Sequence, residues 1–494
     1  MKNSLLFNNV IRIITAFNVY FIVFWGTTLF YIFLWFVNPG NKFIAASFIP
    51  LCALFYLRIK NFRISLLLTY LVSMIIFTGK TYVIQLIPAG VFPKEVFPDG
   101  YIIFFILSIR HLIAVFMLIV LGRDIIITKV KRFRLIKKDL LLILFFLWVV
   151  ISDIFSSRPE ISLLFSLTSL EALILYFYLR VYVENNQKVL LYILWIFIAI
   201  ILFQSSISLM QIFYNSPVFK NIEHQVHIVY FGWAADELQF RFRPLGTFPH
   251  ANILGAWLAF LLSWVFSSLF KRSSSFILFT LIAGSVTLIM TLSRSSWLGY
   301  LVSIMTILFI SEKVNNTPLP KIVVRQLVSL LILAVLLLIF FILPRFEKTL
   351  YSFVENQGGG SLRVAQIEEA IELVLQHPFL GVGSNMSVQE GLKLNPAGIF
   401  SKSPITVHNW YILLASEHGL PAVLLFFSFM LLSIKQLWQN ILKKKGNLSC
   451  SLMIGSLSGV LAILISVLFQ NFMVLNLILL PLAIFTHKEK IRTS

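Results

Sequence analysis

The sequence has few charged residues and almost no cysteine. Asp, Glu, Lys and Arg make up 12% of the 494 residues, and Asp and Glu together number 20. Cys52 and Cys450 lie in or beside apolar stretches, so we expect no disulfide framework. No Asp-x-Asp motif occurs, and no glycine-rich loop ends in Lys followed by Ser or Thr. The sequence therefore shows no sign of a metal-dependent lipid-sugar transferase, which needs such carboxylates, or of an NTPase.

Apolar residues dominate instead. They account for 59% of the chain, with a mean hydropathy of +0.91, which is more than a water-soluble domain can bury. Apolar runs of span length lie near 17–37, 43–57, 64–79, 101–122, 140–156, 161–179, 189–212, 251–270, 276–292, 296–310, 326–343, 409–434, 448–468 and 471–486. At about 1.5 Å per residue, the runs predict an all-α, polytopic helical membrane protein with about 12–14 transmembrane helices.

The net charge of +20 raises the question of nucleic-acid binding, but its placement favours a membrane. Short connections between runs carry Arg58, Lys60 and Arg63, then Arg123, Lys129, Lys131, Arg132, Arg134, Lys137 and Lys138, then Lys443, Lys444 and Lys445. Threading the runs alternately puts these connections on one side, which the positive-inside rule makes cytoplasmic. We therefore expect a multi-pass protein of the cytoplasmic (inner) membrane, with both termini cytoplasmic. Membrane lipids, and no nucleic acid, are the expected partners.

Two long loops, 213–249 and 344–408, then fall outside. The second contains a glycine-rich turn followed by Ser361, which we interpret as a helix N-cap. Apolar residues recur after it at helical spacing, at Val364, Ile367, Ile371 and Val374, and Pro378 stops the run. The pattern predicts an amphipathic helix in a large extracytoplasmic loop, packed on the membrane domain.

Arg294, in TLSRSSWLGY, is the only charged residue between Arg272 and Glu312. The apolar run 276–310 is too long for one span, so Arg294 is expected at a tight outer hairpin. A guanidinium there is costly unless it is paired or hydrated, which makes it a functional candidate. A snorkelling Arg at the interface explains the sequence equally well.

Arg363 lies in the predicted first turn of the outer helix. A cation there opposes the helix dipole by a few tenths of a kcal/mol or more. That placement makes sense if an anion binds at the same point, where helix N–H groups and the guanidinium converge. Pairing with Glu368 or Glu369 is the structural alternative.

Arg241 and Arg243 stand in FRFRPLGTFPHANILG, just before a span on the outer side. Either is suited to bind phosphate, although juxtamembrane Arg more often meets lipid headgroups. His250, in the same segment, is interpreted as an interfacial polar residue.

Imidazole and carboxylate groups near or within the spans complete the candidates. His408 stands at the mouth of a span, and imidazole is well suited to take a proton near neutral pH, although a lone interfacial His is more often structural. Glu417 and His418 follow deeper in that span, where Glu417 is expected to pair with a nearby Arg. Glu171 lies mid-span, and such acids mark proton or ion pathways or pair with polar neighbours.

Four segments in this order resemble the O-antigen ligase and polymerase superfamily. They are RPLGTFPHANILG (243–255), TLSRSSWLG (291–299), SLRVAQIEEAIELVLQHPFLGVGSNM (361–386) and HNWYILLASEHGLPAVLLF (408–426). They lie in the C-terminal half, whereas the first 200 residues match only in hydropathy. The resemblance implies N-terminal transmembrane helices at 1–212, a ligase-like core at 213–434 that includes both outer loops, and C-terminal transmembrane helices at 435–494.

In that superfamily, enzymes transfer a glycan from an undecaprenyl-pyrophosphate carrier to a lipid or glycan acceptor hydroxyl, without metal; we expect no cofactor. The resemblance implies that Arg294 and Arg363 bind the pyrophosphate, with Arg243 as a helper. It makes His408 the base that activates the acceptor. Arg241 and Glu417 remain supporting candidates. Fixed guanidinium groups can stabilise leaving-group charge in place of a metal ion.

The sequence leaves ligase and polymerase equally open, because the two differ only in acceptor. A secondary transporter or flippase that uses Glu171 and Arg294 as a charge pathway is the alternative from another class. Inverted repeats and broken helices are its expected signs, and neither is clear in the sequence.

Overall fold

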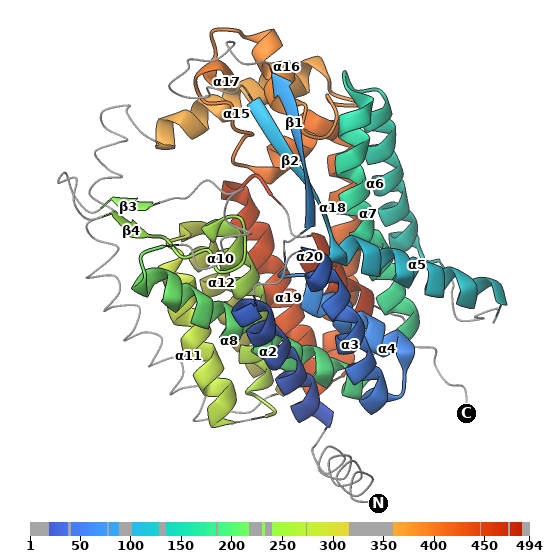
Figure 1. Ribbon diagram of the computed structural model, residues 1–494. Helices are drawn as coiled ribbons and strands as arrows, with labels where there is room; N and C mark the ends of the chain where they lie inside the picture. Colours follow the sequence, from blue (N-terminus) through green and yellow to red (C-terminus); the bar gives the residue numbers. More distant parts are fainter. Residues whose placement is uncertain are drawn as a thin grey trace, which may run out of the picture.

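The computed structural model describes residues 19–37, 41–76, 79–87, 101–127, 135–183, 186–216, 230–232, 240–272, 274–315, 359–444, 446–472 and 475–486. Most of its helices run side by side in one bundle, and α15, α16 and α17 lie together at one end of it (Figure 1, top).

The helices are α2 (Val19–Val37), α3 (Asn41–Ile59), α4 (Phe62–Ser73), α5 (Ile109–Ile127), α6 (Lys137–Ile154), α7 (Pro159–Tyr182), α8 (Gln187–Phe213), α10 (Ala251–Ser268), α11 (Ser275–Met290), α12 (Arg294–Asn315), α15 (Gly359–Gln376), α16 (Ser387–Leu394), α17 (Ile399–Lys402), α18 (Trp410–Lys443), α19 (Leu448–Ser466) and α20 (Leu475–Phe485). Two antiparallel hairpins pair β1 (Gly79–Ile87) with β2 (Tyr101–Ser108), and β3 (Tyr230–Gly232) with β4 (Phe240–Phe242).

Six of the described helices are long and apolar enough to cross a membrane: α7, α8, α10, α12, α18 and the stretch Leu448–Phe469 that begins with α19. Shorter apolar helices accompany them, including α2 and α11. The protein is thus a helical, multi-pass membrane protein, which confirms the predicted fold class.

Helix α10 is the centre of the bundle, since every residue from 254 to 268 is buried. It packs against α12 and α19. These two helices also pack against each other, and a small residue of α12 allows their close approach. A Cβ added at Gly299 of α12 would lie 2.4 Å from the carbonyl oxygen of Ala462 in α19. Small residues at helix contacts are typical of membrane bundles, where packing rather than water exclusion holds helices together.

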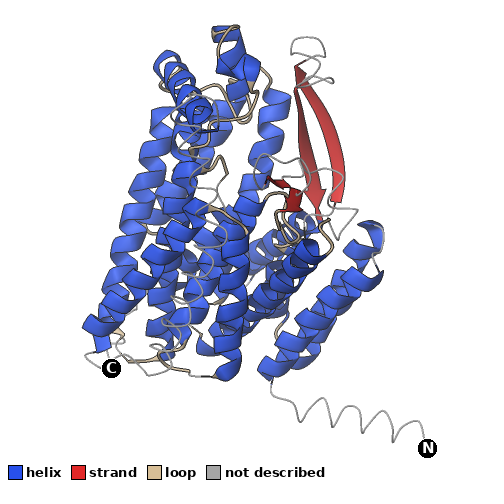
Figure 2. Cartoon of the chain, turned by 90° about the vertical axis from the view of Figure 1, so that its left-hand side faces the viewer, coloured by secondary structure: helices blue, strands red, loops and turns tan. Residues whose placement is uncertain are grey.

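Two predicted spans are wrong. The run 101–122 begins as strand β2, because YIIFFILS pairs with GKTYVIQLI of β1, which also occupies the end of the predicted span 64–79. Short apolar runs rich in branched and aromatic residues suit strands as well as helices. Figure 2 shows this hairpin rising along one edge of the bundle. Among the described residues of the run 471–486, the only helix is α20, whose 11 residues are too short to cross. The predicted span 326–343 lies outside the described residues.

The predicted outer helix exists as α15 and ends before Pro378 as expected, but it begins at Gly359, so Ser361 is not its N-cap. Its buried face also differs from the prediction. Val364 and Ile371 are exposed, whereas Gln366 and Glu369 are buried. Those two polar side chains turn inward because both hold loop segments that follow α15, as described below.

Candidate functional site

Arg294 begins α12 directly after the turn that follows α11, which confirms the predicted hairpin. Leu292 in this turn has a φ of 49°, and the Trp297 indole N–H donates to the carbonyl of Leu288 at 2.9 Å. Gln470, which follows α19 in the sequence, donates from Nε2 to Oγ of Ser295 at 2.6 Å. The turn is therefore fixed from both sides, while the Arg294 side chain is exposed.

Arg243 braces the same turn from the segment before α10. Its Nε donates to the carbonyl oxygen of Thr291, and its Nη2 donates to Oδ1 of Asn252. The side chain is buried, at 7% exposure. Arg243 therefore links the start of α10 to the hairpin that carries Arg294. The side chain of Arg241, in β4, lies outside the described residues.

His250 caps the N-terminus of α10. Its Nδ1 accepts a hydrogen bond from the backbone N–H of Asn252 at 3.0 Å. Asn252 therefore contacts Arg243 through its side chain and His250 through its backbone. The sequence interpretation of His250 as a merely interfacial residue missed this position; an N-cap placement before ANILG was the available signal.

His408 lies just before α18 and faces α15. Its Nδ1 is 3.3 Å from Oε1 of Gln366, whose Nε2 donates to the carbonyl of Ile405 at 3.2 Å. A backbone carbonyl only accepts, so the amide of Gln366 must turn Nε2 towards it and Oε1 towards His408. Nδ1 of His408 therefore carries the proton, and Nε2 keeps a free lone pair. Gln366 lies three residues after Arg363, on the same face of α15, which was its sequence signal.

These side chains influence one another electrostatically. Burial, followed by the positive charge of Arg294, lowers the pKa of Arg363. Burial and the charge of Arg363 lower the pKa of His408 to about 4. Burial, then Arg243, His408 and Arg363, lowers the pKa of His250 to about 4. Charges act on a pKa in this way only when they are near.

Hydrogen bonds tie Arg243 to Thr291 in the Arg294 turn and to Asn252, which also binds His250, while Gln366 of α15 contacts His408. The electrostatic influence of Arg294 and Arg363 on the neighbouring groups links these contacts. We call Arg243, His250, Arg294, Arg363 and His408 the arginine–histidine cluster. Its members come from the segment before α10, the α11–α12 turn, α15 and the start of α18. No carboxylate of the described residues is among the causes of these pKa shifts. A group of fixed cations and imidazoles of this kind is suited to bind a polyanion.

The alternative that Arg363 pairs with Glu369 is not what the structure shows. The Glu369 carboxylate accepts the backbone N–H groups of Ile399 and Phe400, the latter at 3.2 Å, at the start of α17. Glu369 is thus occupied in holding the outer segment together, and the charged groups that interact electrostatically with Arg363 include Arg294 and His408.

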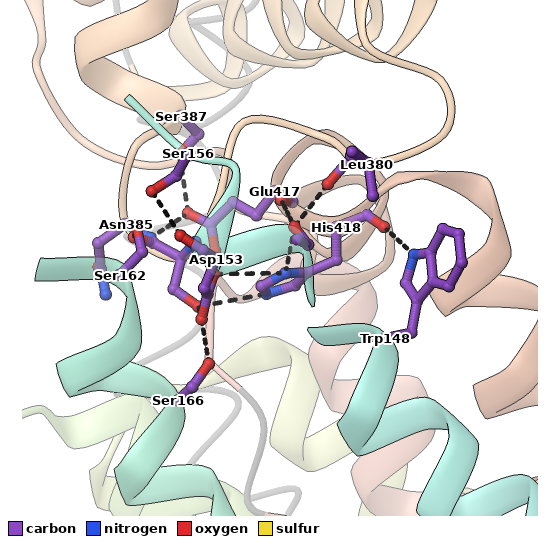
Figure 3. A network of polar contacts seen from close by, with 12 residues as sticks. Trp148, Asp153, Ser156, Ser162, Ser166, Leu380, Asn385, Ser387, Glu417 and His418 are labelled. Carbon is purple, nitrogen blue, oxygen red and sulfur yellow. Dashed lines mark hydrogen bonds and ion pairs between the residues drawn. The ribbon is translucent and has the colours of Figure 1, made fainter. Parts of the chain in front are cut away.

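Glu417 lies in a second polar network, which does not include His408 (Figure 3). Its Oε1 accepts from the backbone N–H of Asn385 at 3.0 Å and from Oγ of Ser387 at 3.1 Å. The expected pairing of Glu417 with an Arg is therefore wrong. Glu417 holds the segment that follows α15 and has no contact with the arginine–histidine cluster among its hydrogen bonds.

The same network contains Asp153 and His418. Asp153, at the end of α6, accepts from the N–H of Ser384 at 2.7 Å and from the hydroxyl of Ser166. His418 Nδ1 lies 3.1 Å from Oγ of Ser152. Sequence reasoning missed Asp153, whose signal was an acid at the end of an apolar run. The network connects α6, α7 and α18 to the outer segment.

A break in α18 accompanies the network. Gly419 has a φ of 75° and a ψ of 174°, which interrupts the helix. The interrupted hydrogen bonds are replaced by the segment 378–383. Val382 and Gly383 donate to the carbonyls of Ser416 and Glu417 at 3.0 and 2.7 Å, and Leu420 donates to the carbonyl of Pro378 at 2.8 Å. We call 378–383 the docking segment.

Glu171 has partners within the helices. Its carboxylate lies 3.3 Å from Nε of Arg110 and accepts from Asn476 at 2.8 Å, and His111 is 3.7 Å away. This arrangement fits the reading of Glu171 as a buried partner of polar neighbours. Arg294 is not among those partners, so the two residues proposed for a transport pathway do not form one site.

Comparison with known proteins agrees with the C-terminal placement of the site. A search of curated proteins gave no match. A family model described as O-antigen ligase matches residues 277–427. The match contains Arg294, Arg363 and His408, whereas Arg243 and His250 precede it. Over residues 277–427 the chain is therefore similar to the O-antigen ligase family.

Proposed function

We propose that the protein transfers a glycan from an undecaprenyl-pyrophosphate carrier to an acceptor hydroxyl at the outer face of the cytoplasmic membrane. The observation that carries the proposal is the arginine–histidine cluster, in which arginines from three separate segments accompany the neutral base His408. The family match to O-antigen ligases supports the reaction class.

Arg294 and Arg363 are the proposed pyrophosphate ligands. Each guanidinium offers a planar fork of donors that fits phosphate oxygens, and an anion between them relieves their mutual repulsion. Arg243 contributes indirectly in this scheme, because Nε and Nη2 are engaged with Thr291 and Asn252. It would hold the Arg294 turn in place as a positioning residue.

His408 is the proposed general base. The acceptor O–H gives its proton to Nε2, and the acceptor oxygen forms a bond to the anomeric carbon of the transferred sugar. The bond from that carbon to the phosphate oxygen breaks, and its electron pair leaves on undecaprenyl pyrophosphate, which Arg294 and Arg363 stabilise. Because Arg363 lowers the pKa of His408, the imidazole is neutral before substrate binds. The bound pyrophosphate offsets that charge and makes His408 a stronger base when it is needed.

The test is transfer by purified protein in lipid, with a chelator present. His408→Ala should fold and bind the donor while transferring about 10²–10⁴-fold more slowly. Arg294→Lys and Arg363→Lys should also transfer poorly, because an ammonium lacks the bidentate fork. Near-normal turnover by His408→Ala would remove the base from the scheme, and full activity of both Lys variants would show that only diffuse positive charge matters.

The acceptor decides between a ligase, which we propose, and a polymerase of the same superfamily. The lipid-linked glycans of a deletion strain distinguish them. Long chains accumulating on the carrier indicate a ligase, and single repeat units on the carrier indicate a polymerase.

A further inference from the structure

His250 has only one nitrogen available to a substrate. Nδ1 is occupied, because it accepts the N–H of Asn252 at 3.0 Å. A backbone N–H can only donate, so Nδ1 carries no proton in this contact, and the neutral imidazole holds its proton on Nε2. His250 therefore presents an N–H donor and cannot act as a base.

His408 has the opposite tautomer. Its Nδ1 donates to Gln366, which leaves the lone pair on Nε2. The cluster thus contains two neutral imidazoles with distinct capacities: His408 can accept a proton, and His250 can only donate a hydrogen bond. The difference arises from the neighbour of each Nδ1, a carbonyl-type oxygen for His408 and a backbone N–H for His250.

The His250 ring is neutral and lies near arginines. Burial first, and then the charges of Arg243 and Arg363 among its neighbours, lowers the pKa of His250 to about 4. Arg243 is also joined to it through Asn252, which contacts both residues. Among the described residues, no hydrogen bond of His250 other than that of Nδ1 is present, so its N–H has no protein acceptor there. An N–H donor near Arg243 and Arg363 is suited to donate to an anion that arginines bind.

We propose that His250 is a third ligand of the donor pyrophosphate, donating from Nε2–H to a phosphate oxygen bound by Arg294 and Arg363. The proposal rests on the proposed function and adds to it a neutral donor. Such a donor adds a directed hydrogen bond without adding to the repulsion among the cations. The alternative is that His250 only caps α10.

His250→Asn separates the two roles. Asn is among the best N-cap residues, and its Oδ1 can accept the Asn252 N–H as Nδ1 does, while its Nδ2 donor lies near the place of the ring Cδ2 and falls short of the position of Nε2–H. Binding of undecaprenyl pyrophosphate to purified protein in phosphatidylcholine nanodiscs is the readout, with thermal stability measured alongside. We expect unchanged stability and an affinity about tenfold or more weaker, as for loss of a hydrogen bond to a charged group. The acid limb of the pH–rate profile should stay in place, because the base is His408.

Arg294→Ala serves as the control for donor binding. If Arg294→Ala loses affinity and His250→Asn binds like the wild type, His250 is only a cap and the inference is overturned, while the proposed function stands. If neither variant changes the binding, the donor site itself is wrong. Undecaprenyl monophosphate is the competing ligand. If the wild type and the His250→Asn variant each bind the monophosphate and the pyrophosphate with equal affinity, the protein attracts any lipid phosphate. That result would also overturn the inference.

Discussion

Oε1 of Gln366 lies 3.3 Å from Nδ1 of His408, and this contact assigns the proton of the histidine to the nitrogen that faces away from the substrate. Changing Gln366 to Leu removes that assignment without adding charge. We expect turnover to fall about 3- to 10-fold, the effect of one neutral hydrogen bond, with donor affinity unchanged. Gln366→Glu places an anion beside the ring and should raise the pKa of His408 by about 1–3 units. The base must be unprotonated to act. As the pH falls, the activity of that variant should therefore begin to drop at a higher pH than that of the wild type.

The pH profile of the wild-type protein should differ between the free and the donor-bound enzyme. In the free enzyme, the pKa of His408 is about 4, so the acid limb of kcat/KM should lie near pH 4. Bound pyrophosphate favours the protonated imidazole, so the acid limb of kcat should lie at higher pH. Coincident limbs would mean that the anion does not bind beside Arg363 and His408.

Glu171 should matter for stability more than for transfer. Glu171→Gln leaves Arg110 without its counter-charge, which for a buried pair is destabilising by about 3–5 kcal/mol. Thermal denaturation in detergent should show the loss, whereas the folded fraction should transfer at a near-normal rate. The double variant Arg110→Gln/Glu171→Gln removes both charges and should recover part of the stability. Loss of transfer in a stably folded double variant would instead give Glu171 a direct role.

Gly381 should not tolerate a side chain. Its φ is +66°, and a Cβ would lie 2.3 Å from the backbone carbon of Glu417. Gly381→Ala is expected to destabilise the protein by about 1–3 kcal/mol. Gly122→Ala is the matched control, because nothing lies within 4 Å of its Cβ and it stands inside α5. That change should be neutral or stabilising by about 0.5–1 kcal/mol. Equal stability of the two variants would contradict the importance of the docking segment.

The proposed orientation predicts which surfaces are reached from outside the cell. In a background without Cys52 and Cys450, a cysteine at the exposed Glu372 of α15 should react with a membrane-impermeant reagent added to intact cells. A cysteine at the exposed Lys188, at the start of α8, should react only after permeabilisation. The reverse pattern would invert the topology and remove the site from the outer face.

Sequence reasoning succeeded where the signal was local. The apolar run 276–310 contains Arg294 as its only charged residue, so the place of its turn was predictable. The residues before Pro378 have helical spacing, so α15 was predictable too. It failed where distant contacts decided the outcome. The buried face of α15 is set by Gln366 and Glu369, whose partners lie 30 or more residues later in the chain. The β1–β2 hairpin resembled part of two spans because an apolar strand paired along its edges has the composition of a membrane helix.

The motif HPFLGVGSNM follows Arg363 in the family-like segment. Its contacts give it a structural use. The backbone of 378–383 supplies hydrogen bonds to Ser416, Glu417 and Leu420, and such a partnership cannot be read from either segment alone.

The docking segment joins the end of α15 to the break in α18, so that α15 and the first part of α18 extend as two arms from one joint. From that joint, Gln366 lies roughly 16 Å back along α15 and His408 roughly 14 Å back along α18, at 1.5 Å per residue. Arms of nearly equal length bring those two side chains to the same level, where they meet. The position of His408 relative to Gln366 therefore depends on contacts well outside the site. A displacement of the docking segment against α18 would move His408 away from Gln366 without a change in either residue.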